Sequence, residues 1–402
     1  MSHYSSLTDT LNFDRRELLR AAGAGAALLG GRLVLGVPSA SGQEKLAEVT
    51  TNIDEFMKVP RGPHALPGPF PGRVVKVTAQ QALAGDTVDG KVVREMVEDG
   101  IRTLTGNSLR TSFRMLFSPD DVIGLKVNPV GTPLIATHPE VVDAVIRWLV
   151  SNKVPRSNIV IWDRFEGMLV EAGFTPKRFP GVRIEGLQRM AEEGQSFRDA
   201  AGQHISAASF DREAVYLARG VVGKGVRGYQ DDEYYLNQHV FNGEESYFGS
   251  LITKRLTKIV NLAAYKNTGN GISMATKNIG YAAICNTGRL HQPLFFQVCT
   301  EVLAAPWIRE KLVLNITDGL RGQYDGGPDK NEQFVYPNRA LYFATDPFAL
   351  DMVCHRELMA VRKAKGVTVN EHPRFTEYLY YAEKLGLGVA TPERIKLVEV
   401  KA

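Results

Sequence analysis

The part of the sequence that decides the fold reads V-I-G-L-K-V at Val122–Val127, T-H-P-E-V-V at Thr137–Val142 and N-I-V-I-W at Asn158–Trp162. The first and last segments are short apolar runs rich in β-branched residues, which is typical of strands buried on both faces. Between them, Thr137 as a candidate N-cap, Pro139 in the first turn and an apolar stripe at helical spacing predict a helix. This order of elements indicates a parallel β–α–β unit.

The alternation continues along the chain in both directions. Further strands are predicted at Arg73–Thr78, Lys258–Ala263, Leu312–Thr317 and Leu341–Thr345, and further helices at Gly90–Leu104, Pro347–Leu358 and Arg374–Leu385. We therefore expect an α/β fold with a mostly parallel sheet covered by helices on both faces. Between residues 174 and 250 the pattern weakens into Gly-, Tyr- and charge-rich sequence, which we interpret as an inserted cap region over one end of the sheet.

The amino terminus has the features of an export signal. Arg15 and Arg16 precede two leucines and a soft apolar stretch at residues 21–38, as in the twin-arginine signal. That stretch is shorter than the about 20 strongly apolar residues of a membrane span, and Ala40-Ser41-Gly42 offers a small-residue cleavage site. We expect residues 1–42 to engage the twin-arginine export machinery, with a periplasmic or otherwise exported mature protein and no stable membrane span. An amphipathic surface helix and a retained anchor are the alternatives.

Composition limits the remaining classes of protein. Residues 43–72 hold five closely spaced prolines and predict an extended arm, which leaves residues 73–402 as the α/β domain. A net charge of +4 over 402 residues gives no sign of the basic surface typical of nucleic-acid-binding domains. The three cysteines, Cys285, Cys299 and Cys354, form no C-x-x-C pair, so no local iron–sulfur or zinc motif is present. We expect three buried thiols, with one disulfide as the alternative.

Polar residues follow the predicted strands where each strand ends. In order along the chain they are Lys126 and Asn128, Asp163 and Arg164, Lys266 and Asn267, Asp318, and Asp346. Ligands of open α/β sheets bind at the carboxyl ends of the strands, so these residues predict one shared polar site. Each also has an ordinary explanation, because Asp318 and Asp346 are good turn formers or helix caps and Lys126 is able to extend to solvent.

Two later segments extend this site. Residues 269–280 read G-N-G-I-S-M-A-T-K-N-I-G and contain Lys277 and Asn278, and Arg289 and His291 follow closely. Gly-rich backbone with nearby cations is suited to a phosphate or a carboxylate, although an ordinary Gly-rich loop has the same composition. We therefore predict a small anionic ligand held by Lys126, Asn128, Lys266, Lys277, Asn278 and Arg289.

The second segment, residues 318–328, reads D-G-L-R-G-Q-Y-D-G-G-P and predicts a long turn-rich loop after a buried strand. His291, Asp318 and Asp325 are candidate ligands of a divalent metal, although no close spacing supports the set. His291, Asp318 and Asp346 are the candidate catalytic residues, as a general base or through a metal.

These segments together resemble the domain of unknown function 362 family, some of whose members are fused to iron–sulfur modules. The resemblance covers roughly residues 73–390 and rests on Ile123–Asn128, Thr137–Val142, Ile159–Arg164, Lys258–Leu262 with Lys266, Ser273–Gly280, Asn286–His291, Asp318–Pro328 and Ala344–Asp351. The chain departs from the family where Asn267 stands, since a histidine commonly follows the lysine there. The resemblance implies a fold and a site rather than an activity.

Two classes of function fit this sequence equally well. One is an exported enzyme or redox accessory that acts on an anionic substrate. The other is a binding protein or cofactor-handling chaperone with the same site and no turnover. Bound anions and reacting anions require the same cations, so the cations alone do not separate the two classes.

Overall fold

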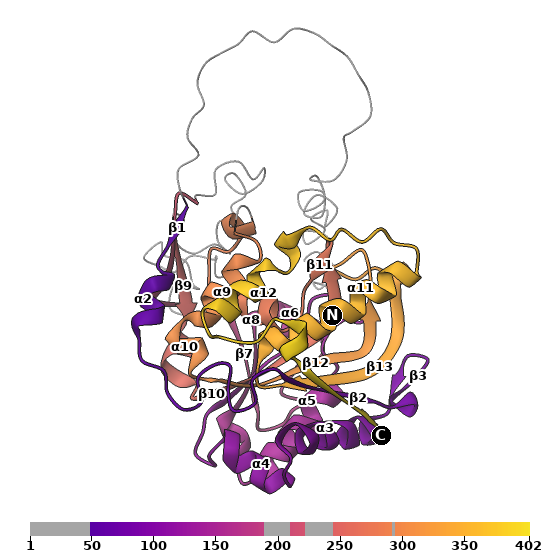
Figure 1. The fold of residues 1–402 in the computed structure, drawn as a ribbon. Helices are drawn as coiled ribbons and strands as arrows, with labels where there is room; N and C mark the ends of the chain where they lie inside the picture. The colour runs from indigo at the N-terminus through magenta and orange to yellow at the C-terminus, as the bar shows by residue number, and fades with distance from the viewer. Residues whose placement is uncertain (1–48, 189–209, 222–243, 292–293) are drawn as a thin grey trace, which may run out of the picture.

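The computed structural model describes residues 49–188, 210–221, 244–291 and 294–402. A central sheet of nine strands runs through this part of the chain (Figure 1), in the order β14-β2-β13-β12-β10-β5-β6-β7, with β11 paired to β10. In that order the strands are Lys396–Lys401, Arg73–Thr78, Val335–Ala344, Leu312–Gln323, Lys258–Thr268, Ile123–Lys126, Ile159–Phe165 and Arg183–Gln188, with β11 at Gly271–Ile272. The sheet and its helices confirm the predicted α/β fold.

The strands of this order run in one direction, with β13 as the exception. β10 pairs in parallel with β5 and β12, and the parallel pairing continues from β5 through β6 to β7. β13 is antiparallel to both of its neighbours, β12 and β2, whereas β14 pairs in parallel with β2. The predicted mostly parallel sheet is therefore confirmed, but the strand that leads to Asp346 runs the opposite way from the others that were expected to share a site.

Helices cover both faces of the sheet (Figure 1). One face carries α3 (Gly90–Thr105), α4 (Leu109–Leu116) and α5 (Pro139–Ser151). The other carries α8 (Ala275–Gly280), α9 (Gln297–Ala304), α11 (Pro347–Ala364) and α12 (Glu377–Lys384). The remaining α-helices of the described chain are α2 (Ile53–Lys58), α6 (Glu166–Glu171) and α10 (Pro306–Arg309).

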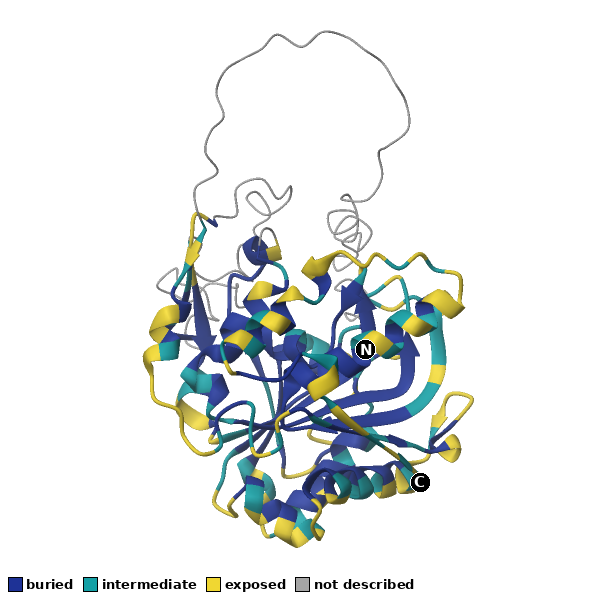
Figure 2. Ribbon diagram, viewed as in Figure 1, coloured by how far each residue is buried: buried dark blue, intermediate teal, exposed yellow. Residues whose placement is uncertain are grey.

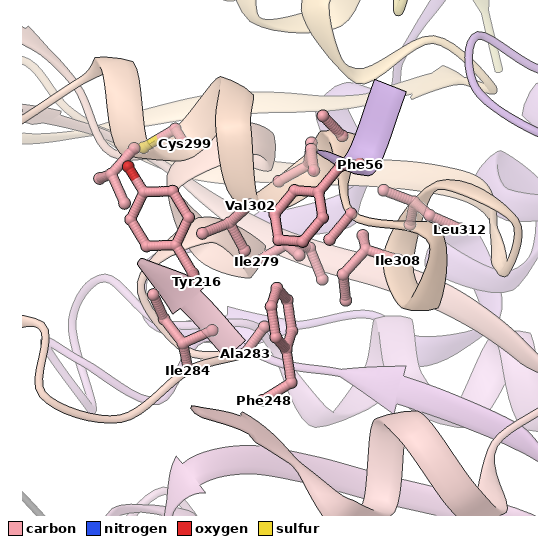
Figure 3. Packing of buried hydrophobic residues seen from close by; sticks show 14 of the residues in the cluster. Phe56, Tyr216, Phe248, Ile279, Ala283, Ile284, Cys299, Val302, Ile308 and Leu312 are labelled. Carbon is pink, nitrogen blue, oxygen red and sulfur yellow. The ribbon is translucent and has the colours of Figure 1, made fainter. Parts of the chain in front are cut away.

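Apolar packing on each face holds these layers together. The central strands β5, β6, β10 and β12 are almost entirely buried, whereas the edge strand β14 is largely exposed (Figure 2). Under α3 and α5, side chains such as Val97, Leu149 and Leu262 are 1% exposed or less. On the opposite face Phe56, Phe248 and other apolar residues pack around α8 and α9 (Figure 3). Burying a side chain of this size stabilises the fold by about 1.5–3 kcal/mol, so these two cores fix the positions of the strand ends.

A smaller sheet lies beside the second core. Its strands are β1 (Thr50–Thr51), β8 (Phe210–Arg219) and β9 (Glu245–Gly249), in the order β1-β8-β9. Of the region expected to form a cap, the structure places β7 in the central sheet and β8 and β9 in this smaller one. Residues 49–72 of the expected arm contain β1 and α2 and contribute Phe56 to the core. Residues 1–48, which include the predicted export signal, lie outside the described residues.

Candidate functional site

Lys126, the last residue of β5, anchors a buried polar network at the carboxyl end of the sheet. Its Nζ donates to Asp163 Oδ1 of β6 (2.6 Å), to Asn278 Oδ1 of α8 (2.8 Å) and to the carbonyl of Val127 (2.6 Å). The side chain is 1% exposed. Burial lowers the pKa of Lys126, and the carboxylate of Asp163 opposes that shift. Three predicted site residues, Lys126, Asp163 and Asn278, are therefore in direct contact.

A chain of amides continues this network across the sheet. Asn278 Nδ2 donates to Asn261 Oδ1 of β10 (2.8 Å), and Asn261 Nδ2 donates to Asn315 Oδ1 of β12 (3.0 Å). Asn261 and Asn315 are missing from the predicted site because each stands inside an apolar strand run. A polar residue within such a run is nevertheless a signal, since buried amides require partners.

Asn278 reaches this position because residues 275–280 form a helix, α8, in place of the expected Gly-rich loop. Asp351 of α11 caps the helix from outside: Oδ1 accepts from Ala275 N (2.8 Å), and Oδ2 accepts from the nitrogen and the hydroxyl of Thr276 (2.9 and 2.6 Å). Burial raises the pKa of Asp351 to about 6. The segment therefore supplies the side chains of Lys277 and Asn278 to the site rather than a backbone cradle.

Lys266 of β10 is a second buried ammonium in this region. Its Nζ donates to Asn128 Oδ1 (3.1 Å) and to the carbonyl of Val130 (2.6 Å), and the residue is 0% exposed. Within the described chain these two neutral oxygens are its hydrogen-bond acceptors. Burial and the ammonium groups of Lys277 and Lys126 lower the pKa of Lys266 to about 7, against the opposing charges of Asp329 and Asp163. Lys277 and Lys126 are therefore both within electrostatic range of Lys266.

Lys277 differs from the other two lysines in its contacts. Its Nζ lies 5.4 Å from the ring centre of Tyr281 and 5.0 Å from that of Phe295. No hydrogen bond or ion pair joins this ammonium to the part of the chain that the structure describes. Burial lowers the pKa of Lys277 to about 8, although the residue is only partly buried. Lys277 is thus a cation whose charge the described fold leaves without a counterion.

His291 lies beside this lysine, in the short helix at Gly288–His291. Its ring centre is 4.7 Å from that of Tyr281 and 5.3 Å from that of Phe295, and Nδ1 is 3.2 Å from the carbonyl oxygen of Gly288. Desolvation by the surrounding groups, followed by the charge of Lys277, lowers the pKa of His291 to about 4, although the residue reaches solvent. The imidazole is therefore neutral at pH 7.

Two arginines of the predicted region have different roles. Arg164, at the end of β6, is buried and donates through Nη1 to the hydroxyl of Thr287. Arg289 instead holds the smaller sheet in place: its Nη1 donates to the carbonyl of Val221 (2.9 Å) and its Nη2 to Ser246 Oγ (2.9 Å). Burial lowers the pKa of Arg289 to about 10. Arg289 thus serves a structural contact and does not join Lys126 and Lys266.

The predicted acidic residues are also dispersed. Asp346 lies at the other end of the sheet, because β13 is antiparallel and its last residue, Ala344, pairs with Asn315 near the start of β12. Asp325 is bound to Arg362 Nη1 (2.7 Å). Asp318 lies within β12, since the strand continues to Gln323 where a loop was expected. Within the described residues no group of three His, Cys, Asp or Glu side chains is placed to hold a metal ion, so His291, Asp318 and Asp325 do not form the predicted set.

Asp318 has a partner that the sequence analysis missed. Its Oδ2 accepts from the backbone nitrogen of His138 (2.7 Å) and lies 2.9 Å from His138 Nδ1. His138, and not Thr137, is the N-cap residue of α5. Thr137 instead donates its hydroxyl to the carbonyl of Leu262 (2.6 Å) and accepts from the nitrogen of Asn128 (2.8 Å). Nothing in the local pattern of T-H-P-E indicates a contact with a residue 180 positions away.

The thiols take no part in this site. Cys285, Cys299 and Cys354 are all free and buried, as expected for three structural cysteines. Burial raises the pKa of Cys285 to about 11 and raises those of Cys299 and Cys354 as well. Because the thiolate is the reactive form, these cysteines are inert at neutral pH.

The fold and the site together define an α/β protein with a group of cations at the carboxyl ends of its parallel strands. Residues 226–356, about a third of the chain, match the family model described as "Domain of unknown function (DUF362)". The matched range contains Lys266, Lys277, His291 and Asp318. No curated protein and no solved structure matches the chain. In the described residues, no helix is both long and apolar enough to cross a membrane.

Proposed function

We propose that the protein binds a small anionic ligand, carrying a phosphate or a carboxylate group, at the carboxyl ends of β5, β6 and β10. Lys277 makes the first contact in this proposal, because it is the partly accessible ammonium and has neither an ion pair nor a hydrogen bond to the described chain. This single observation carries the proposal. A desolvated cation is costly unless a partner compensates its charge, and an anionic ligand provides that compensation.

The surrounding charges support the same conclusion. Lys126 and Lys266 are both buried, and the charges of Lys126 and Lys277 each lower the pKa of Lys266. The carboxylate that contacts this group directly is Asp163, and it is already bonded to Lys126. The charge of a second carboxylate, Asp329, also acts on Lys266. Three ammonium groups therefore stand against two carboxylates, and in a buried setting such an excess of positive charge attracts anions more strongly than on an open surface.

Thermal unfolding of the purified full chain tests this proposal, with inorganic phosphate and succinate as probes and sodium chloride at equal ionic strength as the reference. A ligand that binds the folded state raises the melting temperature. We expect phosphate or succinate to raise the melting temperature of the wild type, and we expect the Lys277→Met variant to lose this response. The response should also decline above pH 8, where Lys277 loses its proton.

Lys311 provides a matched control. It is also partly buried, and burial also lowers its pKa to about 8, but its Nζ donates to the carbonyls of Ile252 (2.6 Å) and Thr253 (3.3 Å). The Lys311→Met variant should respond to the anions as the wild type does. An equal response in the wild type and in Lys277→Met contradicts the proposal, as does a wild type that responds no more to phosphate and succinate than to chloride.

We further propose that the protein reaches its ligand after export through the twin-arginine pathway. The proposal rests on Arg15, Arg16 and the apolar stretch that follows, all outside the described residues. Replacing both arginines with lysine should leave the full-length precursor inside the cell, whereas the wild type should be recovered outside the cytoplasm. Export that persists in the double variant contradicts this part of the proposal.

An enzyme is the second candidate function, and one specific observation favours it over a binding protein. The carboxylate of Asp318 holds the ring of His138, which is a common arrangement in sites of proton transfer.

A further inference from the structure

Asp318 fixes the orientation of His138 at the point where the chain enters α5. Its Oδ2 meets both the backbone nitrogen and Nδ1 of His138, and its Oδ1 accepts from the nitrogen of Leu320 (3.1 Å). The Asp318 side chain is 0% exposed. Because a carboxylate only accepts hydrogen bonds, Nδ1 carries the proton in this pair. Two hydrogen bonds to one oxygen leave the imidazole little freedom to rotate.

The second ring nitrogen, Nε2, is left for another molecule. The side chain of His138 is 13% exposed, and within the described residues Nε2 has no hydrogen-bond partner. An imidazole whose Nδ1–H is bound to a buried carboxylate presents Nε2 as a proton acceptor, and the carboxylate stabilises the imidazolium that forms. The contact between Asp318 and His138 is not a helix cap, because neither of its hydrogen bonds involves an N–H group within α5.

A wide irregularity in β12 begins directly after Asp318. Ala264 of β10 pairs with Asp318 of β12, and Lys266 pairs with Gln323. Over this stretch β12 therefore advances by five residues while β10 advances by two. Bulges of this kind redirect side chains and are frequent beside active sites. Arg321 lies in the bulge, and its charge acts on His138.

Within the described residues, Arg321 bonds to a single carboxylate, that of Asp86 (2.8 Å). The Asp86 side chain is 96% exposed, in the short turn between β3 (Leu83–Ala84) and β4 (Thr87–Val88). An ion pair with so exposed a partner contributes about 1 kcal/mol at most. A carboxylate or phosphate of a ligand is therefore able to replace Asp86 at little cost, because the guanidinium binds both groups through paired hydrogen bonds.

We propose that His138, positioned by Asp318, is a proton-transfer residue for a hydroxyl-bearing molecule whose carboxylate or phosphate group binds Arg321. In the forward step the O–H bond breaks, its electron pair stays on the oxygen, and the proton forms a bond to Nε2. The protonated Nε2 returns the proton in the reverse direction, so no oxidant or reductant is required. This proposal does not depend on the anion site at Lys277.

The charges around His138 set the pH at which it acts. Burial opposes protonation of the ring, but Asp318 of β12 and Glu140 of α5 outweigh both burial and Arg321, and together they raise the pKa of His138 above its ordinary value. Glu140 is itself 3.2 Å from Arg178, and Arg321 is paired with Asp86. We therefore expect Asp318 to control the titration of His138, because it makes the direct contact.

Modification by diethyl pyrocarbonate, which attacks neutral imidazole, tests the proposal on the purified full chain by peptide mass spectrometry. We expect His138 to react with a pH midpoint above 6.5, the ordinary value for histidine. Phosphate or succinate should slow this reaction by about threefold or more at a saturating concentration. The exposed His372 should react at an unchanged rate and serves as the internal reference.

Two variants separate the roles. Arg321→Met should abolish the protection by phosphate or succinate, whereas Arg147→Met, on the exposed side of α5, should retain it. Asp318→Asn should shift the pH midpoint of His138 downward, which a purely structural aspartate would not do. The proposal is overturned if His138 fails to react at every pH between about 5 and 9, or if the protection is absent in the wild type or survives in Arg321→Met. If Asp318→Asn does not fold, the protection of His138 by phosphate or succinate in the wild type and in Arg321→Met still tests the proposal.

Discussion

The buried aspartate at the start of α11 and the lysines around α8 differ in how completely the fold satisfies their charge. Asp346 is 0% exposed, and its two oxygens accept hydrogen bonds from four backbone nitrogens, those of Gly72, Phe348, Ala349 and Val389. Lys266 has two neutral acceptors, and Lys277 has none in the described chain. Asp346 therefore serves the stability of the fold, whereas the charge of Lys277 has no partner within the described residues.

The pKa values alone do not reveal this difference. Burial raises the pKa of Asp346 to about 6 and lowers that of Lys277 to about 8, so desolvation disfavours the charged form at both positions. The bonds around each group distinguish them. A perturbed pKa indicates a functional residue only when the hydrogen bonds of that residue are not already used by the fold.

Replacing Asp346 should have the largest effect on the free energy of unfolding. Asp346→Ala leaves four backbone N–H groups without their acceptor, two of them at the start of α11 and two in the segments around Gly72 and Val389. Each unsatisfied buried donor is costly, so we expect the free energy of unfolding to fall by about 3 kcal/mol. Urea denaturation followed by circular dichroism measures this loss.

Asp89 is the matched control for this experiment. It caps α3 in the same way, with Oδ1 accepting from Lys91 and Val92, but the residue is exposed. Asp89→Ala should cost about 1 kcal/mol, the usual value for an exposed cap. If Asp346→Ala and Asp89→Ala lower the free energy of unfolding equally, the additional hydrogen bonds and the burial of Asp346 add nothing to stability. That result would contradict the distinction between Asp346 and Lys277.

The sequence was sufficient for the layers of the fold but not for the direction of one strand. Apolar runs and helical periodicity are local, so the strands at Ile123 and Ile159 and the helix beginning at Gly90 were predictable. The antiparallel course of β13 was not, because the residues 341–345 form the same kind of apolar run whichever way the strand runs. Asp346 was therefore expected at the wrong end of the sheet.

Part of the site was predictable for the same reason. Lys126, Asn128 and Lys266 follow from the rule that parallel strands share a carboxyl edge. Contacts that form only through the tertiary fold could not be predicted in this way. His138 contacts Asp318, 180 positions away, and Arg289 donates to a backbone carbonyl beside the smaller sheet instead of joining the lysines. A motif shows which side chains are present, but the packing of distant segments decides which of them remain free.

Removing the charge of Lys277, which has no counterion within the described residues, should stabilise the protein at neutral pH. The folded pKa of about 8 lies below the unfolded value of 10.5, so the unfolded chain binds more protons between these values and the wild type gains stability as pH rises through this window. At pH 7, Lys277→Met should therefore be more stable than the wild type by about 1–2 kcal/mol, and the difference should shrink by pH 10. Guanidinium denaturation in chloride without phosphate measures both values. A difference that does not change with pH contradicts the assignment of the charge as unsatisfied.

The smallest predicted effect is a difference in stability between Lys311→Met and Lys277→Met, two variants of lysines with similar pKa values. Lys311 and Lys277 both have a pKa lowered to about 8 by burial, so both methionine variants should show the same pH trend. Lys311→Met also leaves the carbonyls of Ile252 and Thr253 without their donor, so it should be less stable than Lys277→Met by about 1 kcal/mol at every pH. Denaturation of the two variants side by side measures this gap. If they unfold at the same denaturant concentration, the hydrogen bonds of Lys311 contribute nothing, and bonding cannot be what distinguishes a structural cation from one available to a ligand.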